Sequence, residues 1–253
     1  MRVAVVQHDI VWEDPAANFA RLGPMIAAAA ADDARLIVLT ETYSTGFSMN
    51  TGQTAEPADG PSASFLAEQA REHGVWVCGS MPVQAEGAGR PSNCLVLAGP
   101  AGEDHRYRKR HLFSYGGEDD HYLPGAEALT VTIDGVRLSL FVCYDLRFAP
   151  DFWARADETD AYVVIANWPA ARRDHWRTLL RARAIENLAY VIGANRVGTG
   201  GGVETAGDSI IVGPFGETVA FAGSAETTIT GDVDPAMVAS IRSRYPFLTD
   251  RNP

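Results

Sequence analysis

A cysteine that directly follows an apolar run is the first residue of this sequence that could do chemistry. Residues 138–142, Leu-Ser-Leu-Phe-Val, have the length and composition of a buried strand, and Cys143 stands where the pattern changes to polar and charged residues. In open α/β sheets, ligands bind beyond the carboxyl ends of the strands, so a thiol at this point is well placed to act as a nucleophile. The alternative is a buried structural cysteine, because free cysteines are among the most buried residues of proteins.

A carboxylate occupies the same kind of position earlier in the chain. Residues 36–39, Leu-Ile-Val-Leu, form a second apolar run, and Glu41 follows it. A cysteine hydrolase needs a deprotonated thiol, a donor or positive charge for the oxyanion, and a group that protonates the leaving amine and activates water. The candidates for this last group are Glu41, His111, His121 and His175, and no histidine is flanked by a motif that marks it as a base.

Strand-like and helix-like patterns alternate along the chain and would position these residues. Strands are expected at residues 2–7, 36–39, 75–78, 94–97, 130–133, 136–142, 161–166, 190–194, 209–212, 217–221 and 227–231, and helices at 15–31, 62–73, 150–156, 174–188 and beyond 234. No linker interrupts the alternation, which predicts a single layered α/β domain over residues 1–253. Residues 44–60 are expected to form a long loop. The turn at 99–102, Gly-Pro-Ala-Gly, is echoed by Gly-Pro-Phe-Gly at 213–216, which hints at two similar halves.

The composition of the chain excludes several classes of protein. With 46% hydrophobic and 21% charged residues the chain is globular, and a net charge of −11 argues against a nucleic-acid partner, because phosphate binding needs concentrated Lys and Arg. No apolar run approaches the ~20 residues of a membrane span, so no membrane partner is expected. The first residues lack the pattern of a signal peptide, and the three cysteines form no Cys-x-x-Cys pair, which predicts free thiols in a reducing cytoplasm.

Some reactive side chains are expected to be structural. Cys78 and Cys94 lie inside apolar runs, which places them in the core. His8 and His73 lie near the ends of elements and are expected at the surface. No cluster of His, Cys and carboxylates has the spacing of metal ligands, so no metal and no cofactor is expected.

Three motifs in order point to a family. Residues 36–41 (Leu-Ile-Val-Leu-Thr-Glu), 108–113 (Arg-Lys-Arg-His-Leu-Phe) and 143–148 (Cys-Tyr-Asp-Leu-Arg-Phe) resemble the three catalytic motifs of the nitrilase, or carbon–nitrogen hydrolase, superfamily. The resemblance covers essentially the whole chain. It implies a four-layer αββα sandwich with two sheets packed between helices. It also implies a homodimer paired through helices, to which the helix at 174–188 and the C-terminal tail would contribute.

The resemblance assigns a role to each residue of these motifs. Cys143 would be the nucleophile that forms a thioester, and Glu41 would act first as general base and then as acid. Lys109 would place its ammonium group at the oxyanion, assisted by the backbone N–H of Tyr144. Glu118 would support Lys109 and orient the substrate. Two flanking glutamates would keep Lys109 charged, and Lys109 in turn would favour the thiolate of Cys143.

Other residues resemble the omega-amidase branch of this superfamily. They include Ala-Asn-Trp-Pro at 166–169, His-Trp at 175–176 and His-Tyr at 121–122. That branch cleaves the terminal amide of short α-keto dicarboxylic acid monoamides, small molecules with a carboxylate far from the scissile bond, so the pocket needs a cation. Arg172 is the first candidate for this cation and Arg173 the second, although Arg172 could equally be a solvated surface residue. The expected pocket walls are Phe47, Phe113 and Trp168.

Two alternatives compete with an omega-amidase. A nitrilase or an N-carbamoyl amino acid hydrolase would use the same catalytic residues, but the Cys143–Tyr144 pair favours an amidase, since carbamoylases usually have Cys-Arg and nitrilases Cys-Trp-Glu. The second alternative is a binding protein that has lost activity. The presence of all four expected catalytic residues argues against it.

Overall fold

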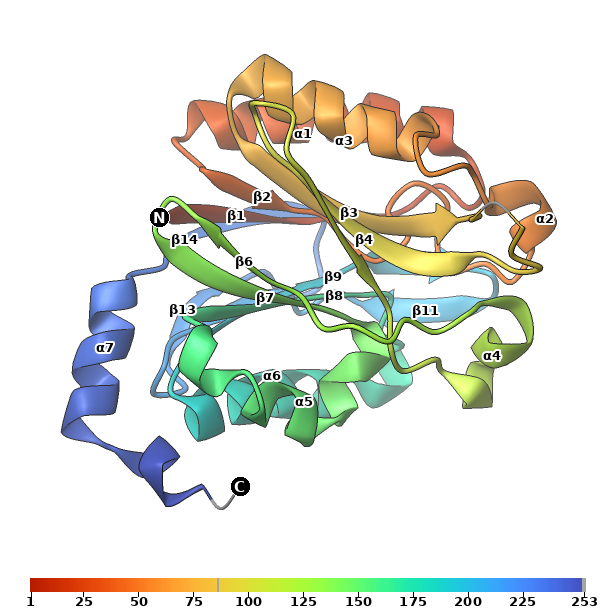
Figure 1. Ribbon diagram of the computed structural model, residues 1–253. Helices are drawn as coiled ribbons and strands as arrows, with labels where there is room; N and C mark the ends of the chain where they lie inside the picture. The colour runs from red at the N-terminus through yellow and green to blue at the C-terminus, as the bar shows by residue number, and fades with distance from the viewer. Residues whose placement is uncertain (86, 252–253) are drawn as a thin grey trace.

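The computed structural model describes residues 1–85 and 87–251, and its core consists of two six-stranded sheets packed face to face (Figure 1). In spatial order the first sheet contains β14 (Thr227–Asp232), β1 (Arg2–Gln7), β2 (Leu36–Val38), β3 (Trp76–Val83), β4 (Ser92–Ala98) and β5 (Asp104–Arg108). The second contains β13 (Thr218–Phe221), β12 (Ile210–Val212), β9 (Tyr190–Asn195), β8 (Ala161–Ala166), β7 (Val136–Val142) and β6 (Thr130–Ile133).

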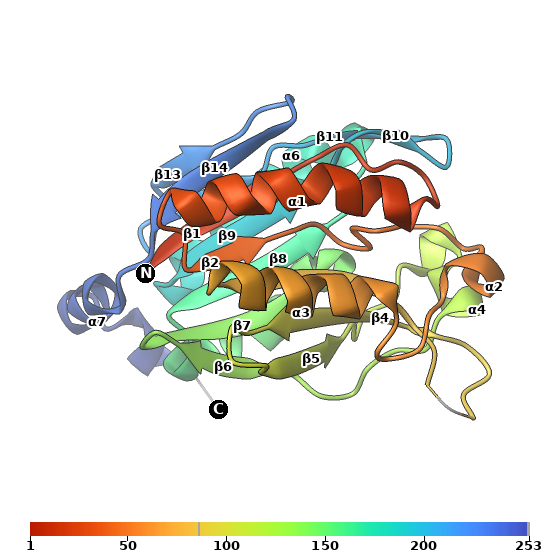
Figure 2. The same cartoon turned by 90° about the horizontal axis from the view of Figure 1, so that it is seen from above.

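Helices cover the outer face of each sheet. Helices α1 (Pro15–Ala31) and α3 (Pro61–His73) lie side by side over the first sheet, as the view from above shows (Figure 2). Helices α5 (Ala149–Trp153) and α6 (Arg173–Asn187) lie on the second sheet (Figure 1). The predicted four-layer αββα sandwich is therefore confirmed.

Apolar strand residues build three buried layers between these elements. Strand side chains alternate between the two faces of a sheet. In the first sheet, Val38 therefore packs between the sheets while Ile37 packs under α1 and α3. In the second sheet, Leu140 faces the first sheet and Phe141 faces α5 and α6. This burial on both faces explains why the central strands read as continuous apolar runs.

Both sheets share one connectivity. The first runs β1–α1–β2–α3–β3–β4–β5 and the second β7–α5–β8–α6–β9–β12–β13, and in each the three leading strands are parallel. The two glycine turns, 99–102 and 213–216, join β4 to β5 and β12 to β13, which are corresponding strands. The two similar halves hinted at by this echo are thus present in the topology.

The sequence patterns missed elements with few buried apolar residues. Strand β5 is an edge strand of charged and polar residues, and the hairpin of β10 (Val197–Gly200) and β11 (Val203–Ala206) lies outside both large sheets. The expected long loop contains the short helix α2 (Thr51–Thr54). The other two α-helices of the described residues are α4 (Glu118–His121) and α7 (Pro235–Arg244).

The expectation that His8 lies at the surface was wrong. His8 is fully buried just after β1, with Nε2 at 3.4 Å from the carbonyl oxygen of Tyr43, and burial lowers the pKa of its imidazole to about 4. Cys78 and Cys94 are in the core as predicted, and burial raises the pKa of their thiols to about 12 and about 11. Across residues 1–85 and 87–251, none of the helices has the length and apolar character needed to cross a membrane.

Candidate active site

Cys143 stands at a sharp turn beyond the carboxyl end of β7. Its backbone has a φ of 49°, in the left-handed region that residues with a side chain rarely adopt, and a 3₁₀ turn over Cys143–Arg147 follows directly. Such strained positions persist only where the surroundings hold them, and they are common at functional sites. The turn directs the thiol out of the sheet and into a cavity that Cys143 lines.

The buried carboxylate of Asp145 holds this turn in place. Its Oδ2 accepts hydrogen bonds from the backbone N–H of Val142 at 2.9 Å and from the hydroxyl of Tyr107 at 2.7 Å. Its Oδ1 accepts from the backbone N–H of His111 at 2.9 Å. Tyr107 belongs to β5 and His111 follows that strand, so Asp145 ties the cysteine turn to the segment that carries Lys109.

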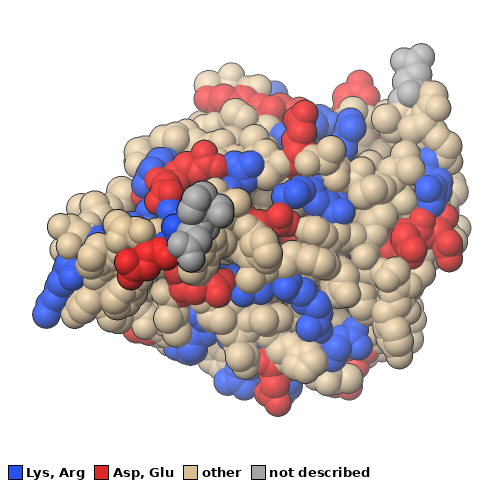
Figure 3. Space-filling model, turned by 60° about the horizontal axis from the view of Figure 1, so that its bottom comes forward, with Lys and Arg blue, Asp and Glu red and all other residues tan. Residues whose placement is uncertain are grey.

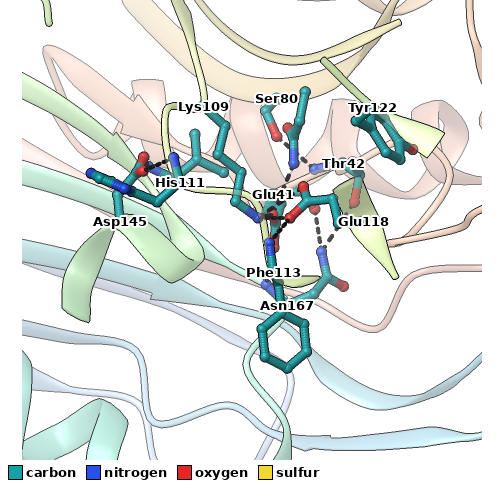
Figure 4. Close-up of polar contacts among 12 residues, drawn as sticks. Glu41, Thr42, Ser80, Lys109, His111, Phe113, Glu118, Tyr122, Asp145 and Asn167 are labelled. Carbon is teal, nitrogen blue, oxygen red and sulfur yellow. Dashed lines mark hydrogen bonds and ion pairs between the residues drawn. The ribbon is translucent and has the colours of Figure 1, made fainter. Parts of the chain in front are cut away.

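Lys109 lies between two carboxylates, and all three side chains are completely buried (Figure 4). Its Nζ donates to Oε1 of Glu41 at 3.0 Å, and it lies 3.0 and 2.9 Å from the two carboxylate oxygens of Glu118. Glu118 begins α4, where its Oε2 also accepts from the backbone N–H of Phe113 at 2.6 Å. The structure therefore brings Glu41, the segment that carries Lys109 and Glu118, and Cys143 together from three separate parts of the chain.

Burial and the neighbouring charges shift the pKa values of Lys109 and Glu118. Burial opposes the charge of Lys109, but the carboxylates of Glu118 and Glu41 outweigh it and raise the pKa of the ammonium group well above its ordinary value. Burial also raises the pKa of Glu118, although Lys109 acts in the opposite direction. Lys109 is thus held in the charged form, as the sequence suggested.

The same surroundings do not favour a resting thiolate at Cys143. Burial raises the pKa of the thiol well above its ordinary value, the charge of Glu41 raises it further, and Lys109 only partly compensates. Lys109 does favour the thiolate, as expected, but burial and the carboxylate of Glu41 outweigh its effect on the pKa of Cys143. The thiol rests protonated beside a carboxylate that can accept its proton.

Two asparagines orient Glu41, and neither was predicted. Asn93 donates from Nδ2 to Oε1 of Glu41 at 2.9 Å. Asn167 donates from its backbone N–H to Oε2 at 2.8 Å and from Nδ2 to the backbone oxygen of Glu41 at 2.6 Å. Asn167 directly follows β8, just as Glu41 follows an apolar run, so its position at a strand end could have identified it from the sequence. Asn93 lies inside β4 and gives no such signal.

A cavity of about 720 Å³ opens above the thiol. Its lining includes Tyr144 and all four predicted pocket residues: Phe47, Phe113, Trp168 and Arg172. The alternative cation, Arg173, is held by Asp208 in a two-point ion pair at 2.9 Å and does not line this cavity.

The histidines considered for proton transfer have other partners. The imidazole of His111 contacts Asp151 at 2.5 Å and stacks on the ring of Phe148, while Nδ1 of His175 accepts from Arg147. His121 ends α4 and is exposed. The described residues include no group of three or more His, Cys, Asp or Glu side chains arranged to hold a metal ion.

Comparisons with known proteins find matches along nearly the whole chain. The family model described as carbon-nitrogen hydrolase matches residues 2–243. The omega-amidase YafV of Escherichia coli (strain K12) is 35% identical over 253 residues, covering 99% of this chain and 96% of that protein. The 2-oxoglutaramate amidase of Bacillus subtilis (strain 168) is 34% identical over 254 residues, and the match covers 98% of this chain and 96% of that protein.

A solved structure shares the whole fold. The crystal structure of XC1258 from Xanthomonas campestris, a CN-hydrolase superfamily protein with an arsenic adduct in the active site, superposes with a TM-score of 0.95. The two chains are 36% identical, and the match covers 100% of this chain and 97% of the other.

Proposed function

Since the chain belongs to the carbon–nitrogen hydrolase family, as a member that acts on amides, we propose that it is an omega-amidase for short α-keto dicarboxylic acid monoamides. The reaction would release ammonia and the α-keto dicarboxylate. The names of two relatives support this substrate class, an omega-amidase and a 2-oxoglutaramate amidase. The observation that carries the proposal is that one cavity holds both the thiol of Cys143 and the guanidinium of Arg172.

The first half of the proposed mechanism forms a thioester. Glu41 accepts the proton of the Cys143 thiol as sulfur attacks the amide carbon, so the thiolate is generated only when it reacts. Lys109 donates to the oxygen that becomes negatively charged, assisted by the backbone N–H of Tyr144. Glu41 then returns the proton to nitrogen, the C–N bond breaks, and ammonia leaves.

The second half hydrolyses the thioester. Glu41 accepts a proton from water as the water oxygen attacks the thioester carbon, and Lys109 again stabilises the oxyanion. The C–S bond then breaks, the proton returns to sulfur, and the acid leaves. Because Asn93 and Asn167 fix both oxygens of Glu41, the same carboxylate can serve both steps.

Glu118 acts in this scheme through Lys109. It supplies the second negative charge that keeps the buried ammonium group protonated, and its own position is fixed by the N–H of Phe113. Lys109 therefore remains a hydrogen-bond donor throughout the cycle.

Arg172 is the proposed partner of the substrate carboxylate. Its guanidinium lies over the ring of Phe113, at 5.3 Å from the ring centre, and it forms no ion pair with any described residue. A guanidinium in a partly buried cavity gains a strong charge-assisted interaction when a carboxylate binds.

Substrate comparison tests this proposal. Arg172→Ala should lower kcat/KM for α-ketoglutaramate by about 10- to 100-fold, the range expected for a lost charged hydrogen bond, and leave a neutral amide of similar length nearly unaffected. Equal losses on both substrates would remove the carboxylate role of Arg172. No turnover of α-keto acid amides by the wild-type protein would refute the proposed function.

A further inference from the structure

Besides Arg172, the cavity contains another arginine that has no role in the proposed mechanism. Arg147, at the end of the turn that begins with Cys143, lines the same cavity. Its guanidinium carbon lies 4.9 Å from the centre of the Trp168 ring and 5.9 Å from that of Tyr144. Its Nη2 donates to Nδ1 of His175 at 3.1 Å. These contacts hold the group in one orientation without neutralising it.

The charge of Arg147 is not balanced by the protein. No ion pair joins it to a carboxylate among residues 1–85 and 87–251. Arg196, which also lines the cavity, pairs with Asp9 at 3.0 Å. The cavity carboxylate outside the catalytic cluster is Glu204, an exposed residue of β11 that pairs with neither Arg147 nor Arg172. Keeping a partly buried cation without a counter-ion is unfavourable, so the cavity is suited to an anion.

Trp168 connects Arg147 to Arg172. The face of its ring lies against the guanidinium of Arg147, and its Nε1 donates to the backbone oxygen of Arg172 at 2.8 Å. The indole is almost completely buried and packs against Trp176, with ring centres 5.6 Å apart. One rigid side chain therefore positions both arginines.

We propose that Arg147 and Arg172 together bind the anionic end of the substrate, and that Arg147 is a specificity-determining residue of this enzyme. An α-keto carboxylate presents three oxygen acceptors in nearly one plane, more than one guanidinium can satisfy with a two-point contact. Two guanidinium groups satisfy all three. This inference rests on the proposed function, because it names the group that the second cation recognises.

Kinetics of Arg147 variants test the inference. Arg147→Met should lower kcat/KM for α-ketoglutaramate by about 10- to 100-fold, mainly by raising KM, while turnover of a neutral amide changes by less than about twofold. Arg147→Lys keeps the positive charge but loses the planar guanidinium, so its kcat/KM for α-ketoglutaramate should lie between those of the wild type and Arg147→Met. Arg71→Ala, which removes an exposed arginine from α3, is the matched control and should behave like the wild type on both substrates.

A second measurement needs no substrate and separates this inference from the proposed function. Alkylation of Cys143 by anionic iodoacetate is compared with alkylation by neutral iodoacetamide, with the modified residue identified by mass spectrometry. Arg147→Met should lower the iodoacetate-to-iodoacetamide rate ratio by about tenfold, corresponding to ~1.4 kcal/mol.

The outcomes can be told apart. If the wild type does not cleave α-keto acid amides but the alkylation ratio falls in Arg147→Met, the proposed function fails and the anion site stands. If the wild type cleaves them and Arg147→Met leaves both the ratio and the KM unchanged, the role of Arg147 is refuted. Equal losses by Arg147→Met on charged and neutral amides, with an unchanged alkylation ratio, would show a purely structural residue and would also overturn it.

Discussion

At the scale of single residues, the site holds one buried positive charge between two carboxylates and beside a thiol. Because Lys109 already lies between Glu41 and Glu118, a thiolate at Cys143 would place a further negative charge beside two buried carboxyl groups. Burial and Glu41 accordingly raise the pKa of the thiol. In the proposed mechanism the proton therefore stays on sulfur until the substrate binds, and Glu41 then accepts it as the base.

This balance predicts how the thiol titrates. The thiolate absorbance of the wild type, corrected by that of Cys143→Ala, should remain absent at pH values where a free cysteine ionises, about 8.5. Glu41→Gln removes a negative charge that raises the pKa of Cys143, so its thiolate should appear at lower pH, while amide hydrolysis is lost. A wild-type thiolate present at neutral pH would contradict this arrangement.

The residues found from sequence and those missed differ in one respect. Glu41 and Cys143 stand directly behind apolar runs, and Lys109 lies in a motif shared with the family, so each carries a local signal. Asn93 carries no such signal, because it acts on Glu41, which is 52 residues away in the sequence and is brought close only by folding. Asp145 and Arg147 lie in the motif at 143–148, but the groups that they contact in other elements could not be identified from the sequence. His8 was misplaced because burial of a polar side chain beyond a strand end leaves no mark in the local pattern.

At the scale of elements, the site depends on strands from both sheets ending at one edge. Glu41 follows β2, Cys143 follows β7 and Asn167 follows β8, while Lys109 follows the edge strand β5. The central strands were predictable because they are buried on both faces. Strand β5 and the β10–β11 hairpin were not, since charged edge strands and small glycine-containing hairpins lack an apolar run.

Asp145 connects the turn that follows β7 to β5 and the segment after it, and its replacement should destabilise the fold. Asp145→Ala leaves two buried donors, from Val142 and Tyr107, and a partly buried one, from His111, without an acceptor. It should lower the free energy of unfolding by about 4 kcal/mol. Asp145→Asn retains one acceptor oxygen, so its free energy of unfolding should fall by less than that of Asp145→Ala. Denaturant unfolding measures both values. A loss below about 1 kcal/mol in Asp145→Ala would contradict the bracing role.

At the scale of the whole molecule, the two halves share one core. The layer between the sheets contains Val5 and Val38 from the first half and Leu140 and Ile192 from the second. Because neither half can bury this layer alone, we propose that the chain forms a single domain. The face that carries α5, α6 and α7 shows Lys and Arg interspersed with Asp and Glu rather than one positive field (Figure 3).

We also propose that the protein forms a homodimer through α6 and the C-terminal segment. Ile185 on α6 is 49% exposed and lies against Gly216, whose neighbour Phe215 is also 49% exposed. Phe215 contacts the ring of Tyr245 at 4.9 Å between ring centres, and Phe247 adjoins it. A contiguous apolar surface of this kind is typical of an interface.

The oligomeric state can be measured directly. Light scattering at micromolar concentration should give twice the 27.2 kDa chain mass, and Ile185→Glu should shift the population toward monomer because it places a charge in the apolar contact. Arg71→Ala serves as the control, with a dimer mass. A monomeric wild type would refute the dimer.

The central claim is that Cys143 cleaves the terminal amide of α-keto acid monoamides. Ammonia release by the purified protein should be measured with α-ketoglutaramate and α-ketosuccinamate, alongside glutamine, a simple nitrile and an N-carbamoyl amino acid, with Cys143→Ala as the blank. We predict rapid release from the two keto acid amides, none in the blank, and little from the other compounds. Release from the nitrile or the N-carbamoyl compound but not from the keto acid amides, or undiminished release by Cys143→Ala, would contradict the claim.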